Sequence, residues 1–100
     1  MYHQGQGVIQ DYKKAVKWYR KAAQQGYARA QYNLATMYYQ GYGVLKNEIT
    51  ARAWDLIATM NGLKQAKKRI DLIEKSMNRT DILAAQKKAQ QIQEQIERKK

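Results

Sequence analysis

Residues 37–44 read MYYQGYGV, and this stretch decides the fold because residues 1–8 read MYHQGQGV, almost the same eight letters 36 positions earlier. Shifting the sequence by 36 positions also pairs Ala15 with Ala51, Trp18 with Trp54, Ala22 with Ala58, Gly26 with Gly62 and Ala30 with Ala66. Residues of these types determine packing and turns, so their return at one spacing predicts a repeated structural unit. A period between 20 and 50 residues is typical of solenoids, whose units pack mainly on their neighbours.

Apolar residues recur at three- and four-residue steps in five segments, which is the pattern of one face of an amphipathic helix. Glycine follows three of these segments, where a left-handed end to a helix is easiest. Asp11, Asn47 and Thr80 stand at the start of segments and are suited to cap helix N-termini. We therefore predict helices near residues 11–24, 28–40, 47–61, 63–77 and 80–98. The connections are short, so successive helices should pack antiparallel.

Trp18 and Trp54 occupy the same position of the repeat, each on the apolar stripe of its helix. Stacking against a ligand is one interpretation of these rings. Periodicity favours a structural one, in which each large ring fills the space between neighbouring helices. We predict that both tryptophans belong to the core.

The repeat pattern fails in the last segment, which has one narrow apolar seam and an otherwise polar surface. The seam consists of Ile82, Ala85, Ala89, Ile92 and Ile96. A terminal capping helix needs only one such seam, because it has one neighbour. We predict an all-α fold in which antiparallel helix pairs form a short right-handed solenoid, with about two repeats in residues 1–78 and a C-terminal capping helix at 80–98.

The composition bounds what kind of protein this is. One hundred residues suit a single modest domain, and the absence of cysteine excludes disulfides and thiolate metal sites. The chain has no apolar run long enough to span a membrane and does not begin like a signal peptide, which leaves its compartment open. There are 19 Lys and Arg against 8 Asp and Glu, a formal charge of +11 that favours acidic partners.

Residues that carry out catalysis are scarce. His3 is the one histidine, Ser76 is the one serine, and Asp71 and Glu74 lie among lysines as on a solvated helix face. No His, Asp and Glu residues have the spacing of metal ligands, so we expect neither catalysis nor a metal or other cofactor. The two GxGV stretches lack the preceding strand and fuller glycine pattern of a phosphate-binding loop. We interpret them as turns between helices, with glycines where a side chain would be blocked.

The pattern of residues closely resembles the Sel-1-like repeat, a relative of the tetratricopeptide repeats. The residues that carry the resemblance are GxGV, then Asp11, Ala15, Trp18, the pair Ala22-Ala23, Gly26, Ala30, Leu34, Tyr38 and GYGV. The resemblance covers residues 1 to about 66. Residues 66–92 also look like the C-terminal cap of many bacterial members.

The resemblance implies a non-catalytic protein-interaction scaffold. In tetratricopeptide-like folds the first helix of each pair lines a concave groove, which would take a partner peptide or an acidic surface. On this chain the implied groove residues are Arg29, Tyr32, Asn33, Thr36, Tyr39, Lys68 and Arg69. Converging Arg, Asn and Lys side chains suit a carboxylate, and tyrosines supply contact area at low entropic cost.

The register of the resemblance adds two alternatives. Met1 and Tyr2 correspond to the end of a helix whose body is missing, so the face of helix 11–24 should be partly uncovered. The chain is then either the C-terminal piece of a longer repeat protein or one copy of a homodimer. The self-association residues we predict are Tyr12, Val16, Tyr19 and Ala23. Binding of nucleic acid through the +11 charge is a weaker alternative, because the basic residues are spread over several helices.

Overall fold

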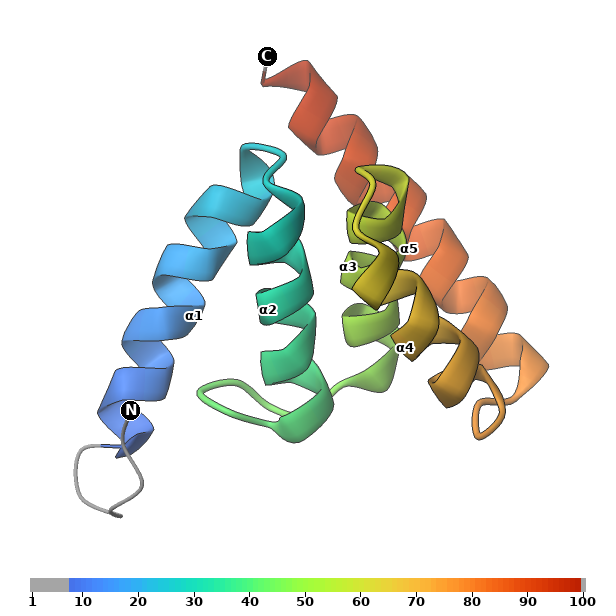
Figure 1. Cartoon of the computed structure of the whole chain (residues 1–100), viewed down its shortest axis with the longest axis horizontal. Helices are drawn as coiled ribbons and strands as arrows, with labels where there is room; N and C mark the ends of the chain where they lie inside the picture. The colour runs from blue at the N-terminus through green and yellow to red at the C-terminus, as the bar shows by residue number, and fades with distance from the viewer. Residues whose placement is uncertain (1–7, 100) are drawn as a thin grey trace.

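A computed structural model describes the backbone of residues 8–99 and the side chains of residues 11–99. Within that range the chain forms α-helices and no strands (Figure 1). The helices are α1 (Val8–Gln24), α2 (Ala28–Gln40), α3 (Glu48–Met60), α4 (Lys64–Glu74) and α5 (Arg79–Arg98). The predicted all-α helical-repeat fold is confirmed. The first GxGV stretch except Val8, the sole histidine and the two residues that set the register lie outside the described residues.

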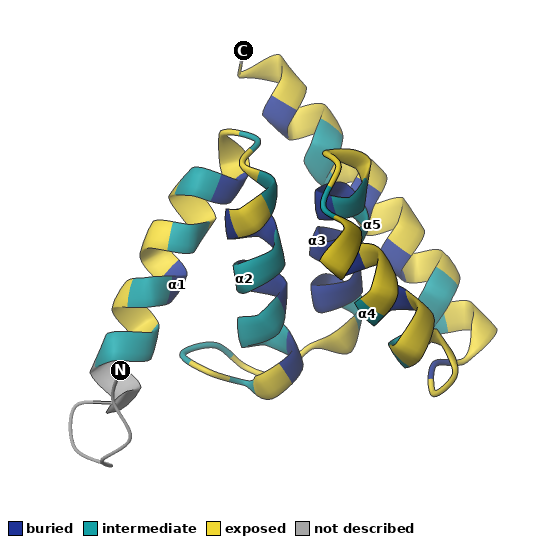
Figure 2. Cartoon of the chain, in the orientation of Figure 1, coloured by how far each residue is buried: buried dark blue, intermediate teal, exposed yellow. Residues whose placement is uncertain are grey.

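The helices are stacked side by side, and most of the core lies between α2 and α3. Leu34 of α2 and Ile57 of α3 have no exposed surface. Figure 2 shows that buried residues line the facing sides of these two helices, whereas α1 and α5 each carry a narrow buried line. Alanine lets the helices approach closely, and Ala35, Ala51 and Ala53 are all fully buried. This is the packing of a helical stack in which each element contacts its neighbours.

The GYGV stretch forms the turn between α2 and α3. Gly41 ends α2 in the left-handed conformation, with φ +75°, and its N–H donates to the Met37 carbonyl. Gly43 has φ +74°, and a Cβ there would lie 2.8 Å from the backbone carbonyl of Tyr12. The glycines therefore serve two different needs, a helix end and the close passage of the turn along α1.

Two predicted helix caps were wrong. Helix α1 begins at Val8, so Asp11 lies inside the first turn, where a carboxylate still favours the positive end of the helix dipole. Thr80 also lies inside its helix, because Asn78 is the N-cap of α5 and accepts from the Asp81 N–H. Asn47 caps α3 as predicted and accepts from the Thr50 N–H at 3.0 Å.

Helix α5 departs from the expected packing of successive helices. It packs mainly against α3 and makes few contacts with α4, which precedes it in the chain. Its buried residues, Ala85, Ala89 and Ile96, all belong to the predicted apolar seam. Ala89 and Ile96 enter the same core as Trp54 and Ile57. The apolar seam of α5 packs where it buries more apolar surface, and α3 offers more such surface than the polar α4 does.

The two tryptophans have opposite environments, so the prediction that both belong to the core was wrong for Trp18. Trp54 is 6% exposed and Trp18 is 70% exposed. Helix α3 packs against α2, α4 and α5, whereas α1 packs mainly against α2. The same repeat position is therefore covered in α3 and open in α1.

Between residues 8 and 99, no helix has both the length and the apolar character needed to cross a lipid bilayer.

Candidate interaction surfaces

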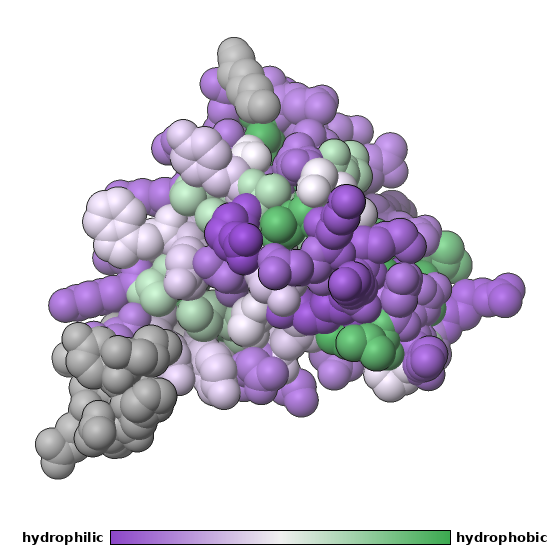
Figure 3. Space-filling view, viewed as in Figure 1, coloured by the Kyte–Doolittle hydropathy of each residue, from purple (hydrophilic) through white to green (hydrophobic). Residues whose placement is uncertain are grey.

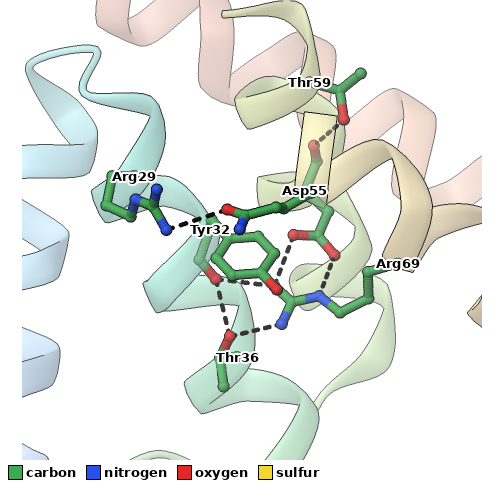
Figure 4. Close-up of polar contacts among 7 residues, drawn as sticks. Arg29, Tyr32, Thr36, Asp55, Thr59 and Arg69 are labelled. Atoms are coloured by element: carbon green, nitrogen blue, oxygen red, sulfur yellow. Dashed lines mark hydrogen bonds and ion pairs between the residues drawn. The ribbon is translucent and has the colours of Figure 1, made fainter. Parts of the chain in front are cut away.

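The guanidinium of Arg69, on α4, joins three helices (Figure 4). Its Nε and Nη2 donate to the two carboxylate oxygens of Asp55 on α3, both at 2.8 Å. Its Nη1 donates to Thr36 Oγ1 at 2.6 Å, and Nη2 also donates to the Tyr32 carbonyl at 2.8 Å, both on α2. The guanidinium lies 3.9 Å from the ring centroid of Tyr32 and 4.9 Å from that of Tyr39. This arrangement fixes α4 against both helices of the preceding pair.

The Arg69–Asp55 ion pair is largely buried, and this burial affects the pKa values of the groups around it. The side chain of Asp55 has no exposed surface and that of Arg69 is 18% exposed. Burial by itself lowers the pKa of Arg69, but the hydrogen bonds and charge of Asp55 outweigh burial and raise it. Arg69 therefore stays charged at any pH at which the protein folds. Burial raises the pKa of the nearby Tyr39 phenol well above its usual range, and the Asp55 charge acts in the same direction.

The seven predicted groove residues lie on α2 and α4, but not all of them face a partner. Tyr39 is buried, and the polar atoms of Arg69 are occupied by intramolecular hydrogen bonds. Their predicted role as free binding groups is corrected on this ground. The remaining residues are reachable from solvent. Arg29 and Lys68 are exposed, and Tyr32, Asn33 and Thr36 are half-buried.

Arg29 and Lys68 share one face of the molecule. The Nη1 of Arg29 donates to Gln65 Oε1 at 3.1 Å, which links α2 to α4 at the surface. Gln65 lies three residues before Lys68, so the two side chains are neighbours along one side of α4. We call Arg29, Tyr32, Asn33 and Lys68 the α2–α4 face. In Figure 3, hydrophilic side chains (purple) dominate the part of the surface over α4. Residues of intermediate or apolar character (pale or green) gather toward α1 and α2.

The residues predicted to form an uncovered face on α1 are mostly covered. Val16 and Ala23 are buried, and Tyr12 and Tyr19 are half-buried. The Tyr12 ring stacks on Tyr42, with centroids 4.5 Å apart. Val16 and Ala23 are therefore not available for self-association, and the role predicted for Tyr12 and Tyr19 stays a prediction.

The open part of α1 carries a different set of residues. Trp18 lies among Lys14, Lys17 and Lys21, and the four side chains line a shallow pocket of about 160 Å³. The Nζ of Lys21 lies 5.6 Å from the centroid of the Trp18 ring. We call these four residues the Trp18 ridge. It is an exposed aromatic surface surrounded by positive charge.

A cavity of about 740 Å³ lies between α3, α4 and α5. Its apolar lining includes Leu56, Met60, Ile70 and Ala89. Its carboxylates come from α4 and α5 and are Asp71, Glu74, Glu94 and Glu97. These are four of the eight Asp and Glu residues of the chain. We call this cavity the carboxylate groove, and it concentrates negative charge on a strongly positive protein.

The cations of the carboxylate groove neutralise it in part. Lys67 pairs with Asp71 at 3.3 Å, and Arg52 Nη2 lies 3.7 Å from Glu74 Oε1. Among the described residues Glu94 and Glu97 have no ion pair, although Glu97 accepts a hydrogen bond from Gln93. The Arg52 side chain is 4% exposed, and its Nε and Nη1 have no hydrogen-bond partner within residues 11–99.

A second cavity, of about 360 Å³, lies on the other edge of α5 and has the opposite charge. Its charged residues are Arg20, Lys88 and Lys99, with Trp54, Ile92 and Ile96 in its lining. Arg20 Nη2 donates to Tyr38 Oη at 3.0 Å. The two edges of α5 therefore border surfaces of opposite charge.

Sequence reasoning missed three buried polar residues. Gln31 has no exposed surface, and it donates to the Ala23 carbonyl while accepting from Asn61 Nδ2. Asp55 and Arg52 are buried in α3, where the other buried residues are apolar except for Thr50. The sequence does place charged or amide residues beside the apolar stripes of these helices. Because such a residue needs a hydrogen-bond partner when it is buried, this position could have indicated the internal polar contacts.

Comparison with known proteins identifies the repeat. A family model described as Sel1 repeat matches residues 1–27 and 28–63, which is more than half of the chain. The chain is also similar to chitin synthase regulatory factor 3 of Schizosaccharomyces pombe, with 37% identity over 78 residues. The match covers 78% of this chain and 8% of the relative, so the chain corresponds to a small part of that protein. The relative is fungal, and the likeness to bacterial caps stays a prediction.

Proposed function

The chain belongs to the Sel1 repeat family, whose repeats are generally protein-interaction modules, and from this we propose that it is a non-catalytic scaffold that binds an acidic partner protein on its α2–α4 face. In this proposal residues 1–78 form the repeats and residues 80–98 form the cap. The name of the S. pombe relative describes a regulatory factor, and such a role fits binding better than catalysis.

The observation that carries the proposal is the position of Arg29 and Lys68 on one face, held there by Arg69. The four hydrogen bonds of Arg69 fix α4 relative to α2. The backbone positions that carry the exposed cations Arg29 and Lys68 are therefore held in a constant relation to each other. A rigid surface loses less conformational entropy on binding than a mobile one, which favours recognition of a carboxylate-rich partner.

Tyr32 and Asn33 supply the non-ionic part of this face. Tyr32 is half-buried, and its ring is held by the guanidinium stacked on it. An aromatic ring that is already fixed adds contact area at low entropic cost. The half-buried Asn33 brings both a donor and an acceptor for a peptide backbone.

The test compares two variants that lose the same positive charge. We would measure the anisotropy of a fluorescein-labelled peptide of alternating Glu and Leu. Its affinity for Arg29→Ala/Asn33→Ala/Lys68→Ala should fall about tenfold or more, as expected for loss of two charge-assisted contacts. The control Lys75→Ala/Lys87→Ala removes two exposed lysines outside the face, and its affinity should fall less than about threefold.

Equal losses in the two variants would show that net charge alone attracts the peptide, and would overturn the proposed face. An unchanged affinity in the triple variant would do the same. Circular dichroism of each variant checks that the helices are intact. Salt dependence equal in the two variants would point to the general field of the +11 chain and not to a defined site.

A further inference from the structure

We propose that the protein associates with itself head to tail, with the Trp18 ridge of one copy seated in the carboxylate groove of the next. The proposal concerns residues other than the four of the α2–α4 face and does not depend on the function proposed above. It names both halves of the contact within one sequence.

The carboxylate groove requires a partner that is both apolar and cationic. Its floor is apolar, with Leu56, Ile70 and Ala89 among the lining residues. Glu94 and Glu97 lie at its α5 edge without an ion pair among the described residues. A partner that buries only apolar surface there would leave these carboxylates desolvated, which is costly unless a cation accompanies it.

The Trp18 ridge has the complementary chemistry. The Trp18 ring is 70% exposed, an unusual state for the largest side chain, and three lysines surround it. Tryptophan that fills a pocket at the centre of a contact is a frequent energetic anchor. Lysine stems cover apolar surface while their ammonium groups reach outward, here toward the Glu94 and Glu97 edge.

The occupant is a second copy because both complementary surfaces lie on every molecule, and within one molecule the carboxylate groove lies on the edge of α5 that faces away from α1. Helix α1 lies at one side of the stack and α4 at the other, with α2 and α3 between them, while the C-terminal end of α5 extends back toward α1 (Figure 1). A contact between two different surfaces is heterologous, so a dimer made this way still has one free ridge and one free groove. Growth then continues beyond the dimer.

The charge of the whole chain makes this contact depend on salt in a particular way. Two copies of net charge +11 repel each other at low ionic strength. Screening over about 8–10 Å near 0.1–0.15 M salt weakens that long-range repulsion while contacts at the interface persist. We expect association to be strongest at such intermediate salt and weaker both below and well above it. One ridge in one groove is a small contact, so affinity should be weak.

The decisive experiment mixes two variants, each defective on one surface. Trp18→Glu places a carboxylate on the ridge, opposite the groove carboxylates. Glu94→Lys/Glu97→Lys makes the groove edge repel the ridge. Light scattering should show that wild-type mass rises with concentration without stopping at a dimer, and that each variant alone stays at the 11.7 kDa of one chain. An equimolar mixture should form a 1:1 complex and stop there, because one intact ridge and one intact groove remain.

The matched control is Leu72→Glu, which adds a carboxylate at an exposed apolar residue outside both surfaces and should assemble like the wild type. A wild-type mass that stops at a dimer would show a symmetric contact and overturn the proposal. So would variants that assemble alone, a mixture that stays monomeric, or a wild type that is monomeric at every concentration and salt. Circular dichroism confirms that each variant is folded, and Trp18→Ala provides a second, uncharged ridge variant.

Discussion

Arg69 of α4 and Asp55 of α3 form a bidentate ion pair, with both nitrogen–oxygen distances at 2.8 Å and no exposed surface on the Asp55 side chain. The remaining donors of Arg69 reach Thr36 and the Tyr32 carbonyl on α2. One guanidinium therefore connects the helix pair α2–α3 to the next helix. Such a pair is costly to break from one side only, because the other charge is left buried.

Arg69→Met should reduce the free energy of unfolding by about 3–5 kcal/mol, since it leaves the Asp55 carboxylate buried without its hydrogen-bonded cation. The double variant Arg69→Met/Asp55→Leu should recover a large part of that loss, because neither charge remains. Urea denaturation followed by circular dichroism measures both values. A single variant that loses less than about 1 kcal/mol would show that water reaches Asp55.

Arg52→Met should leave stability unchanged or raise it by up to about 2 kcal/mol. Arg52 is buried, its Nε and Nη1 lack partners among the described residues, and its nearest carboxylate oxygen is 3.7 Å away on Glu74. Glu74 is largely exposed and keeps its solvation when the arginine is removed. The same denaturation experiment applies, and a clear loss of stability would mean that the Arg52 nitrogens are satisfied in solution.

The pH dependence of Tyr39→Phe tests the buried phenol. The pKa of Tyr39 in the folded protein is raised by burial, so above the ordinary pKa near 10 the unfolded chain releases this proton and the folded chain keeps it. Stability from this group is complete below pH 10 and falls as pH rises, by about 1.4 kcal/mol per pH unit. The free energy of unfolding of the wild type, relative to that of Tyr39→Phe, should therefore fall between pH 10 and 11 with that slope when both are measured from pH 8 to 11.

At neutral pH the same variant should be as stable as the wild type or slightly more stable. The Tyr39 hydroxyl lies near the Asp55 carboxylate but forms no well-aligned hydrogen bond within residues 11–99, and a poorly paired buried hydroxyl is unfavourable. A difference that does not vary with pH would mean that Tyr39 ionises normally in the folded state. A large loss at neutral pH would mean that the hydroxyl is bonded in solution.

Gly43→Ala should cost more stability than Gly41→Ala, although both glycines have nearly the same positive φ. A Cβ at Gly43 would lie 2.8 Å from the Tyr12 carbonyl atoms, whereas a Cβ at Gly41 meets its neighbours at 3.4 Å or more. Gly41→Ala should lose about 1–2 kcal/mol from its backbone conformation alone. Gly43→Ala should exceed that value because α1 must move. Equal losses of stability for the two variants in thermal denaturation would show that the turn accommodates a Cβ at Gly43 without an added free-energy cost.

Trp54→Ala should destabilise the protein by about 3–5 kcal/mol, and Trp18→Ala should change its stability by less than about 0.5 kcal/mol. The two residues share one repeat position but are 6% and 70% exposed. Thermal denaturation at low protein concentration keeps self-association out of the comparison. Similar losses for both variants would contradict the open position of Trp18.

The sequence predicted the helices and turns because these follow from local patterns. The period of 36 residues and the GYGV glycines are local signals, and the structure places a turn and a change of helix there. The pairing of Arg69 with Asp55 was not predicted, because it depends on how two helices are rotated toward each other. The exposure of Trp18 was missed because burial depends on the neighbouring helix, which a repeat pattern assumes but does not supply.

The candidate binding residues rested on family geometry. Arg29 and Lys68, which it directed toward a groove, are exposed on α2 and α4, and their binding role stays a prediction. Family geometry could not show that Arg69 is occupied by internal hydrogen bonds. The carboxylate groove went unrecognised, since it arises only because α5 packs on α3 beside α4 and leaves space between the three helices.

Because α3 packs against more helices than α1 does, the two helices should also unfold in a definite order. Helix α3 contacts three others, whereas α1 is attached mainly through α2 and through the Gln31 bond to the Ala23 carbonyl. In a linear array of helices a unit with few packing neighbours can melt while the rest stays folded. Amide protons of α1 should therefore exchange through a local, low-energy opening, and those of α3 only when the whole chain unfolds.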